Sequence, residues 1–137
     1  MINENDINIK KANRLDIIKL NFLCEEDDEW FEGIKIMAND LLSSYDEQTL
    51  CFIAFYNDEA IGFIFGFVLH KQTLYPQFMY VKDEFRKMGV GKQLMNALET
   101  QSGCKTSFIY YKKILREYFA KQGYDADEGL EIAVKML

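Results

Sequence analysis

The residues best suited to chemistry lie in a short basic turn, Arg86-Lys87-Met88-Gly89-Val90-Gly91-Lys92, which we call the glycine turn. Its glycines lack the Cβ atoms that would keep a bulky anion away from the backbone. The apolar periodicity that follows predicts a helix, and the first amides of a helix have no partner within it. With Lys82 nearby, the turn gathers four cations in a chain of formal charge −6. This combination indicates a phosphate-binding site.

Two common phosphate-binding patterns do not fit the glycine turn. Gly91-Lys92 is followed by Gln93, whereas the phosphate loop of nucleotide hydrolases requires serine or threonine there. The dinucleotide-binding fingerprint requires a third glycine. An ordinary strand-to-helix turn with solvated lysines remains the alternative interpretation.

A second candidate site is acidic. Five consecutive acids, Glu25 to Glu29, precede Trp30, the only tryptophan, and we call Glu25–Trp30 the acidic segment. One interpretation is a solvated loop whose tryptophan folds back onto the core. The other is an acceptor site for a polycationic amine, with an acidic rim and an aromatic wall. The residues expected to contact that amine are Glu26, Asp27, Asp28 and Trp30.

The elements that position these residues follow from apolar patterning. We expect strands at 7–11, 50–56 and 61–69, another strand ending at Val81, and one at 104–110. Pro76 has to lie at the beginning of its strand or at a bulge, because it cannot donate to a ladder. We expect helices after the N-cap Asn13, at 31–43, from Val90 to about Gln101, and at 112–122. A closing hairpin is expected from 124–126 and 131–137.

Each of these helices has a predicted buried face. The first is expected to turn Leu15, Ile18, Leu20 (or Ile17) and Phe22 toward the core. The last is expected to do so with Ile114, Leu115, Tyr118 and Phe119. In both cases the prediction rests on periodicity alone.

The length, the composition and the net charge of the chain narrow the class of protein. A length of 137 residues predicts one domain, residues 1–137, with no need for disulfides or metal. Three cysteines without a CxxC spacing, and no signal peptide, predict the cytoplasm. No apolar run is long enough to span a bilayer, and the acidic balance argues against nucleic acid. A small amine is the partner we expect.

Arg86-x-x-Gly89-x-Gly91, between an apolar strand and an amphipathic helix, resembles the pyrophosphate-binding motif of the GNAT superfamily of acyl-CoA N-acyltransferases. The element order from about residue 48 is similar as well. The resemblance implies an α/β (α+β) fold: a mixed, mostly antiparallel sheet with a splayed central parallel strand pair and helices on both faces. It implies acetyl-CoA as cosubstrate, without a metal, and leaves a homodimer open. The cofactor-binding residues it implies are Met79, Tyr80 and Val81 through their backbone, and Arg86, Lys87, Met88, Gly89, Val90, Gly91 and Lys92.

The implied function is acetyl transfer from acetyl-CoA to a primary amine of a small, cationic acceptor, and the segment from Val68 to Lys71 loosely resembles the aminoglycoside-acetylating branch. The family's carboxylate base is missing from the strand before the motif, so candidates move to Glu26, Asp27, Asp28, His70 or Tyr80.

The family's proton-donating tyrosine is replaced by Phe119. Tyr118 precedes it by one residue, which rotates a helical side chain by about 100°. Tyr118, Tyr111 and Tyr80 are the catalytic candidates, with aromatic packing as the plainer role for Tyr118 and Tyr111. The alternative function is a catalytically impaired CoA-binding module that serves as a sensor or interaction protein.

Overall fold

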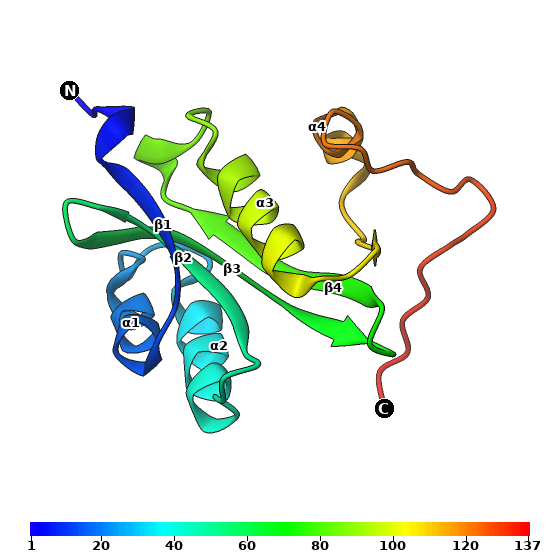
Figure 1. Cartoon of the computed structure of the whole chain (residues 1–137), viewed down its shortest axis with the longest axis horizontal. Helices are drawn as coiled ribbons and strands as arrows, with labels where there is room; N and C mark the ends of the chain where they lie inside the picture. Colours follow the sequence, from blue (N-terminus) through cyan, green and yellow to red (C-terminus); the bar gives the residue numbers. More distant parts are fainter.

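The structure, a computed structural model, describes all residues from 1 to 137. Its centre is a five-stranded sheet in the order β1-β2-β3-β4-β5 (Figure 1). The strands are β1 (Ile7–Lys11), β2 (Leu50–Tyr56), β3 (Glu59–Leu69), β4 (Thr73–Val81) and β5 (Thr106–Ser107). The first four pair antiparallel and β5 lies parallel to β4. The helices are α1 (Arg14–Lys19), α2 (Phe31–Ser43), α3 (Val90–Ser102) and α4 (Arg116–Ala120).

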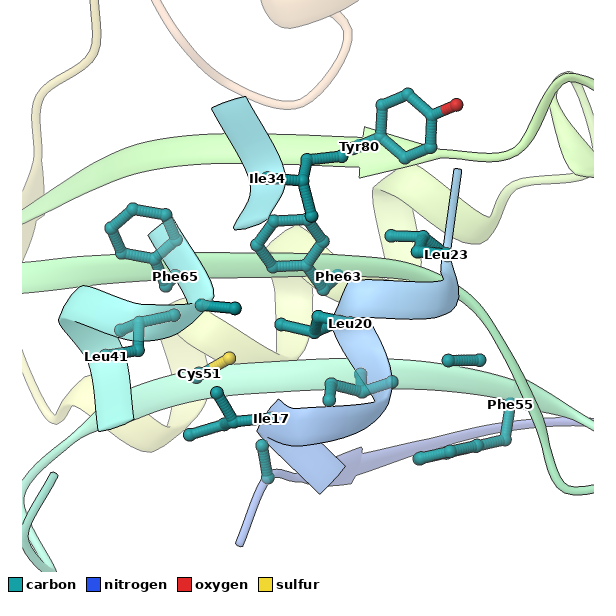
Figure 2. Packing of buried hydrophobic residues seen from close by; sticks show 14 residues of the cluster. Ile17, Leu20, Leu23, Ile34, Leu41, Cys51, Phe55, Phe63, Phe65 and Tyr80 are labelled. Carbon is teal, nitrogen blue, oxygen red and sulfur yellow. The ribbon is translucent and has the colours of Figure 1, made fainter. Parts of the chain in front are cut away.

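Helices cover both faces of the sheet, which confirms the predicted mixed α/β architecture. Figure 1 shows α1 and α2 on one face and α3 on the other. On the first face, side chains from α1 and α2 pack on alternate residues of β2, β3 and β4 (Figure 2). On the second face, α3 buries Val90, Leu94, Met95 and Leu98 against the opposite residues of the same strands. None of the helices is long and apolar enough to cross a bilayer.

The predicted inward face of α1 is confirmed only at Leu20 (or Ile17), and its N-cap is confirmed. Asn13 accepts from the Asp16 amide, and Asp16 accepts from the Asn13 amide, in a capping box. The buried side chains are Ile17, Leu20 and Leu23, whereas Leu15, Ile18 and Phe22 are 70%, 43% and 80% exposed. The six-residue helix continues as a 3₁₀ turn over Leu20–Phe22. Three residues per turn bring positions 17, 20 and 23 onto one face.

The bulge expected at Pro76 is confirmed. Phe65 pairs with Phe78, but Gly66 pairs with Pro76, so that Gln77 is an extra residue in β4. Beyond the bulge, the side chains of Phe78 and Tyr80 face α1 and α2, and those of Met79 and Val81 face α3. The bulge therefore sets which side chains of β4 reach each face.

The region after α3 contains less regular structure than predicted. The strand expected at 104–110 is only Thr106–Ser107, and the helix expected at 112–122 is a 3₁₀ turn, Lys113–Leu115, followed by α4. The closing hairpin of 124–126 and 131–137 is wrong, since neither segment pairs with a strand. An alternating pattern forms a strand only where another edge accepts its hydrogen bonds. The predicted face of the last helix reduces to Phe119, while Ile114 is 87% exposed and Leu115 and Tyr118 remain about 40% exposed.

Candidate functional site

The glycine turn presents open backbone at the start of α3. Gly89 is the N-cap, with φ +80°, and no side chain bonds to the helix end. No atom lies within 4 Å of the position that a Cβ on Gly89 would occupy. The first intrahelical bond runs from Gln93 N–H to the Gly89 carbonyl, so the amides of Val90, Gly91 and Lys92 have no helical partner. These are the features that bind an anion.

Two of the four predicted cations are engaged elsewhere. Lys82 pairs with Glu59 at 2.8 Å. Arg86 pairs with Asp83 at 2.5 Å, and its Nε donates to the Val81 carbonyl at 2.7 Å. Lys87 and Lys92 form no ion pair. Arg86 therefore shapes the turn, and the two lysines supply its free positive charge.

The parallel pairing of β4 with β5 stops after two residue pairs, Thr73 with Thr106 and Leu74 with Ser107. A further bond runs from the Phe108 amide to the Leu74 carbonyl. From there to Val81, β4 has no partner on that edge. Lys82 N–H donates to Ile61 on β3, and strand polar groups alternate in direction, so Met79 and Val81 direct theirs toward the open edge. This is the splayed strand pair that the family resemblance implied.

Tyr118 reaches the glycine turn from α4. Its hydroxyl oxygen is 3.0 Å from the position of a Cβ on Gly91, and the Met79 methyl carbon is 3.2 Å from it. The ring is 40% exposed and packs edge-on against Phe119, with 5.0 Å between centroids. The open edge of β4, the start of α3 and a phenol hydroxyl are thus brought together.

Tyr111 and Phe119 have packing positions. Phe119 is 8% exposed, in the core beneath α3, and its ring contacts those of Tyr111, Tyr118 and Tyr124. The residue at the family's tyrosine position therefore carries no hydroxyl and is buried.

Tyr80 lies at the α1–α2 face of β4 and is 6% exposed. Its hydroxyl donates to Asp28 Oδ2 at 2.6 Å. Burial, with the hydrogen bond to Asp28 next, raises the pKa of Tyr80 well above its ordinary value. The same bond, with a second from the Trp30 amide, lowers the pKa of Asp28. Phenol and carboxylate are therefore held in their neutral and anionic forms, respectively.

The remaining acceptor candidates are spread along the acidic segment. Glu26 and Asp27 are exposed, without an ion pair or side-chain hydrogen bond, whereas Trp30 packs edge-on against Phe78 at 5.0 Å. The aromatic wall expected of Trp30 thus includes Phe78, a contact that the sequence did not indicate. His70 lies in the β3–β4 turn, at the opposite end of β4 from the glycine turn. The site therefore does not include it.

One further cluster was not predicted. Tyr75, on β4, stacks with Phe108 at 5.2 Å and lies 6.0 Å from Tyr110, both in the segment after β5. Phe108 and Tyr110 are about half exposed. Three aromatic residues close to the ends of two expected strands were the available signal, but spacing alone does not show that they meet where β4 and β5 part.

Solved structures share this fold. The aminoglycoside N-acetyltransferase AAC(6')-Iy, in complex with a bisubstrate analogue of CoA, is 18% identical, with TM-score 0.69 over 96% of this chain and 99% of that one. An integron cassette protein from the V. cholerae mobile metagenome is 19% identical, with TM-score 0.72 over 96% and 93%. A ribosomal-protein-alanine N-acetyltransferase from Brucella melitensis biovar Abortus 2308 is 14% identical, with TM-score 0.69 over 95% and 99%. At these identities the likeness concerns the fold.

The sequence itself gives the family. No curated protein sequence matches this chain significantly. The acetyltransferase (GNAT) domain family matches residues 47–126, more than half of the chain, from just before β2 to beyond α4. That range contains the parted strands, the glycine turn and α3. The chain therefore belongs to the GNAT acetyltransferase family.

Proposed function

We propose that this protein is an N-acetyltransferase that uses acetyl-CoA to acetylate a primary amine of a small, cationic acceptor, and that residues 1–137 form its one domain. The observation that carries the proposal is the early end of the β4–β5 ladder. After Leu74, β4 continues to Val81 with one edge unpaired. The strand then leads through the 3₁₀ turn Asp83–Phe85 into the glycine turn.

The residues present fit CoA. An unpaired strand edge with the polar groups of Met79 and the N–H of Val81 suits an extended chain that carries amides, as in strand addition by a peptide. The free amides at the start of α3, with Lys87 and Lys92, suit a diphosphate, and Gly89 leaves space for it. When bound, acetyl-CoA supplies the acetyl group as a thioester. Arg86 keeps the turn in shape for it through the Val81 carbonyl.

The acidic segment suits an ammonium-bearing acceptor. Its carboxylates attract a cation, and the edge-on pair of Trp30 and Phe78 offers an aromatic wall. A bound ammonium group has to lose a proton before it can attack a carbonyl carbon. Asp28 is a poor base because its pKa is lowered and both its oxygens accept hydrogen bonds. Glu26 or Asp27 is the better candidate base, directly or through water.

Tyr118 is the candidate that supplies a proton on the donor side. Its hydroxyl lies beside Gly91, whereas Tyr111 packs on Phe119. A thiol of ordinary pKa near 8.5 is also a tolerable leaving group as the anion. Tyr118→Phe should therefore lower kcat without abolishing it.

Thiol release from acetyl-CoA across a panel of mono-, di- and polyamines tests the function. Gly91→Glu should abolish CoA binding, because the added chain meets Tyr118 and Met79 and repels a diphosphate. Asn96→Glu is the matched control, since it makes the same charge change at an exposed site of the same helix. CoA at 100 times its Kd should stabilise the wild type and the control by about 2.7 kcal/mol. No stabilisation of the wild type would refute the proposal.

A second candidate function is a CoA-binding module without turnover, which the buried Phe119 favours. Such a module would bind CoA tightly and release no thiol with any amine of the panel. Phe119→Tyr discriminates further: in an enzyme that lacks its acid we expect a gain of activity, whereas a module would gain none.

A further inference from the structure

Tyr80 makes the hydrogen bond that connects the acidic segment to the sheet. Its hydroxyl donates to Asp28 Oδ2 at 2.6 Å, across 52 positions of sequence. The other hydrogen bonds of Glu25–Trp30 stay within the segment or run to α2. In Figure 2 the Tyr80 ring lies at the margin of the buried cluster, and its hydroxyl points away from the core. The bond is therefore made at the boundary between packed sheet and loop.

Asp28 connects the hydrogen bond from Tyr80 to Trp30. Its Oδ1 accepts from the Trp30 amide at 2.8 Å while Oδ2 accepts from Tyr80. The Trp30 ring in turn packs on Phe78, with 5.0 Å between centroids. Phe78 and Tyr80 lie two residues apart on one face of β4. The acidic segment thus contacts β4 at two adjacent points, one polar and one aromatic.

The Tyr80 ring also contacts Arg86 of the glycine turn. The Arg86 guanidinium carbon is 5.4 Å from the ring centroid, and the same guanidinium donates to the Val81 carbonyl. One side chain therefore touches both halves of the site: the donor turn through its ring and the acidic segment through its hydroxyl.

The protonation states of Tyr80 and Asp28 favour a structural role for this pair over proton transfer. The pKa of Tyr80 is raised by burial and the Asp28 bond, and the pKa of Asp28 is lowered by the Tyr80 bond. Neither group changes charge near neutral pH. A charge-assisted bond of this length is among the stronger side-chain interactions.

We propose that Tyr80 is a positioning residue: it docks the acidic segment against β4 and so fixes where the acceptor amine is held relative to the glycine turn. The kinetic part rests on the proposed function, whereas the docking part does not. The pair takes no part in bond making. It sets the distance between two halves of the site that are far apart in the sequence, Glu25–Trp30 and Arg86–Lys92.

Tyr80→Phe tests this directly, because it removes the hydroxyl and keeps the buried ring. Tyr56→Phe is the matched control, since Tyr56 packs on Phe85 and its hydroxyl has no hydrogen-bond partner. Trp30, the only tryptophan, reports docking through acrylamide quenching of its fluorescence. We expect stronger quenching than in the wild type for Tyr80→Phe and Asp28→Asn, and unchanged quenching for the control Tyr56→Phe. The double variant should add little to either single one.

The kinetic readout separates positioning from simple stabilisation. In Tyr80→Phe, KM for the amine should rise about tenfold, the loss expected for one hydrogen bond to a charged group, with kcat and CoA affinity changing much less. Unchanged quenching would overturn the docking whatever the activity. Increased quenching with an unchanged KM would overturn the positioning role. If the wild type acetylates no amine, the proposed function fails while the quenching result still decides the docking.

Discussion

Residues 7–102 and residues 104–137 differ in how much of their backbone is paired in the sheet and in how many of their side chains are buried. The first stretch contains the long ladders of β1 to β4 and all buried side chains but one. In the second stretch only Phe119 is buried, and Leu130, Ile132, Val134 and Met136 are all more than 60% exposed. Figure 1 shows the last residues as an irregular tail that runs outside the strands of the sheet.

Because of this difference, the proposed CoA-binding residues and the candidate proton donors lie in different stretches. The open edge of β4, the glycine turn and α3 all belong to the packed stretch, so the proposed donor site lies in the well-packed part of the molecule. The candidate proton donors Tyr111 and Tyr118 belong to the sparse stretch. Binding of CoA and delivery of a proton should therefore respond to different mutations.

The largest effect is expected from Phe63→Ala. Phe63 is fully buried at the centre of β3, and such truncations cost about 3–5 kcal/mol of unfolding free energy. Urea unfolding followed by circular dichroism measures the loss. Phe119→Ala is the paired variant, in which we expect a smaller global loss and faster amide hydrogen exchange confined to residues 104–124. Equal global losses would mean that the two stretches unfold as one unit.

A smaller loss is expected from Tyr124→Phe. The Tyr124 hydroxyl donates to Glu99 on α3 at 2.5 Å and is hydrogen-bonded to Ser107 on β5 at 2.7 Å. Burial raises its pKa to about 12, so it stays protonated across the physiological range. Losing a bond to a charged group costs about 1.5–3 kcal/mol. The cost should appear as faster amide hydrogen exchange in the residues after α3, while the affinity for CoA is retained. A loss of CoA affinity would contradict the separation of CoA binding from residues 104–137.

Gly89→Ala probes the donor turn. Its φ of +80° costs an L-residue about 1–2 kcal/mol, while no neighbouring atom would clash with the added methyl. Thermal unfolding without ligand measures this strain. Gly33→Ala, on α2 and without positive φ, is the control, and we expect it to be neutral or stabilising.

The smallest effect is expected when the pH is lowered. The lowered pKa of Asp28 means that its contribution to docking is complete above the ordinary carboxyl value of 3.8 and is lost as pH falls through the folded value. Quenching of Trp30 should therefore be constant from pH 7 to 5 and rise below 3.8, while far-UV circular dichroism still reports the sheet. In Asp28→Asn this acid-dependent rise should disappear.

Sequence reasoning succeeded where a pattern is long or a residue type is restrictive. The bounds of α2 and β2, the N-cap Asn13 and the bulge at Pro76 were all predictable. The inward face of α1 was predictable only at Leu20 (or Ile17), because a six-residue helix followed by a 3₁₀ turn has no single period. The tail around Ile132 alternates like a strand, but an alternating pattern does not show whether a partner edge exists.

The candidate site was predictable in its local parts and not in its long-range contacts. The glycine turn and the acidic segment stand out by composition. The bond from Tyr80 to Asp28 spans 52 residues, and the commitment of Arg86 to a backbone carbonyl depends on how the chain bends after β4. Neither leaves a periodic or compositional trace in one sequence.

The Arg86–Val81 bond has a consequence for engineering. Because a planar guanidinium serves a carbonyl, a carboxylate and an aromatic ring at once, lysine cannot replace it at this position. The glycines alone would not reproduce the loop on a foreign scaffold. Any graft of the proposed anion site has to carry the continuous segment from Tyr80 through Gly91, with the strand end and the helix start moved as one piece.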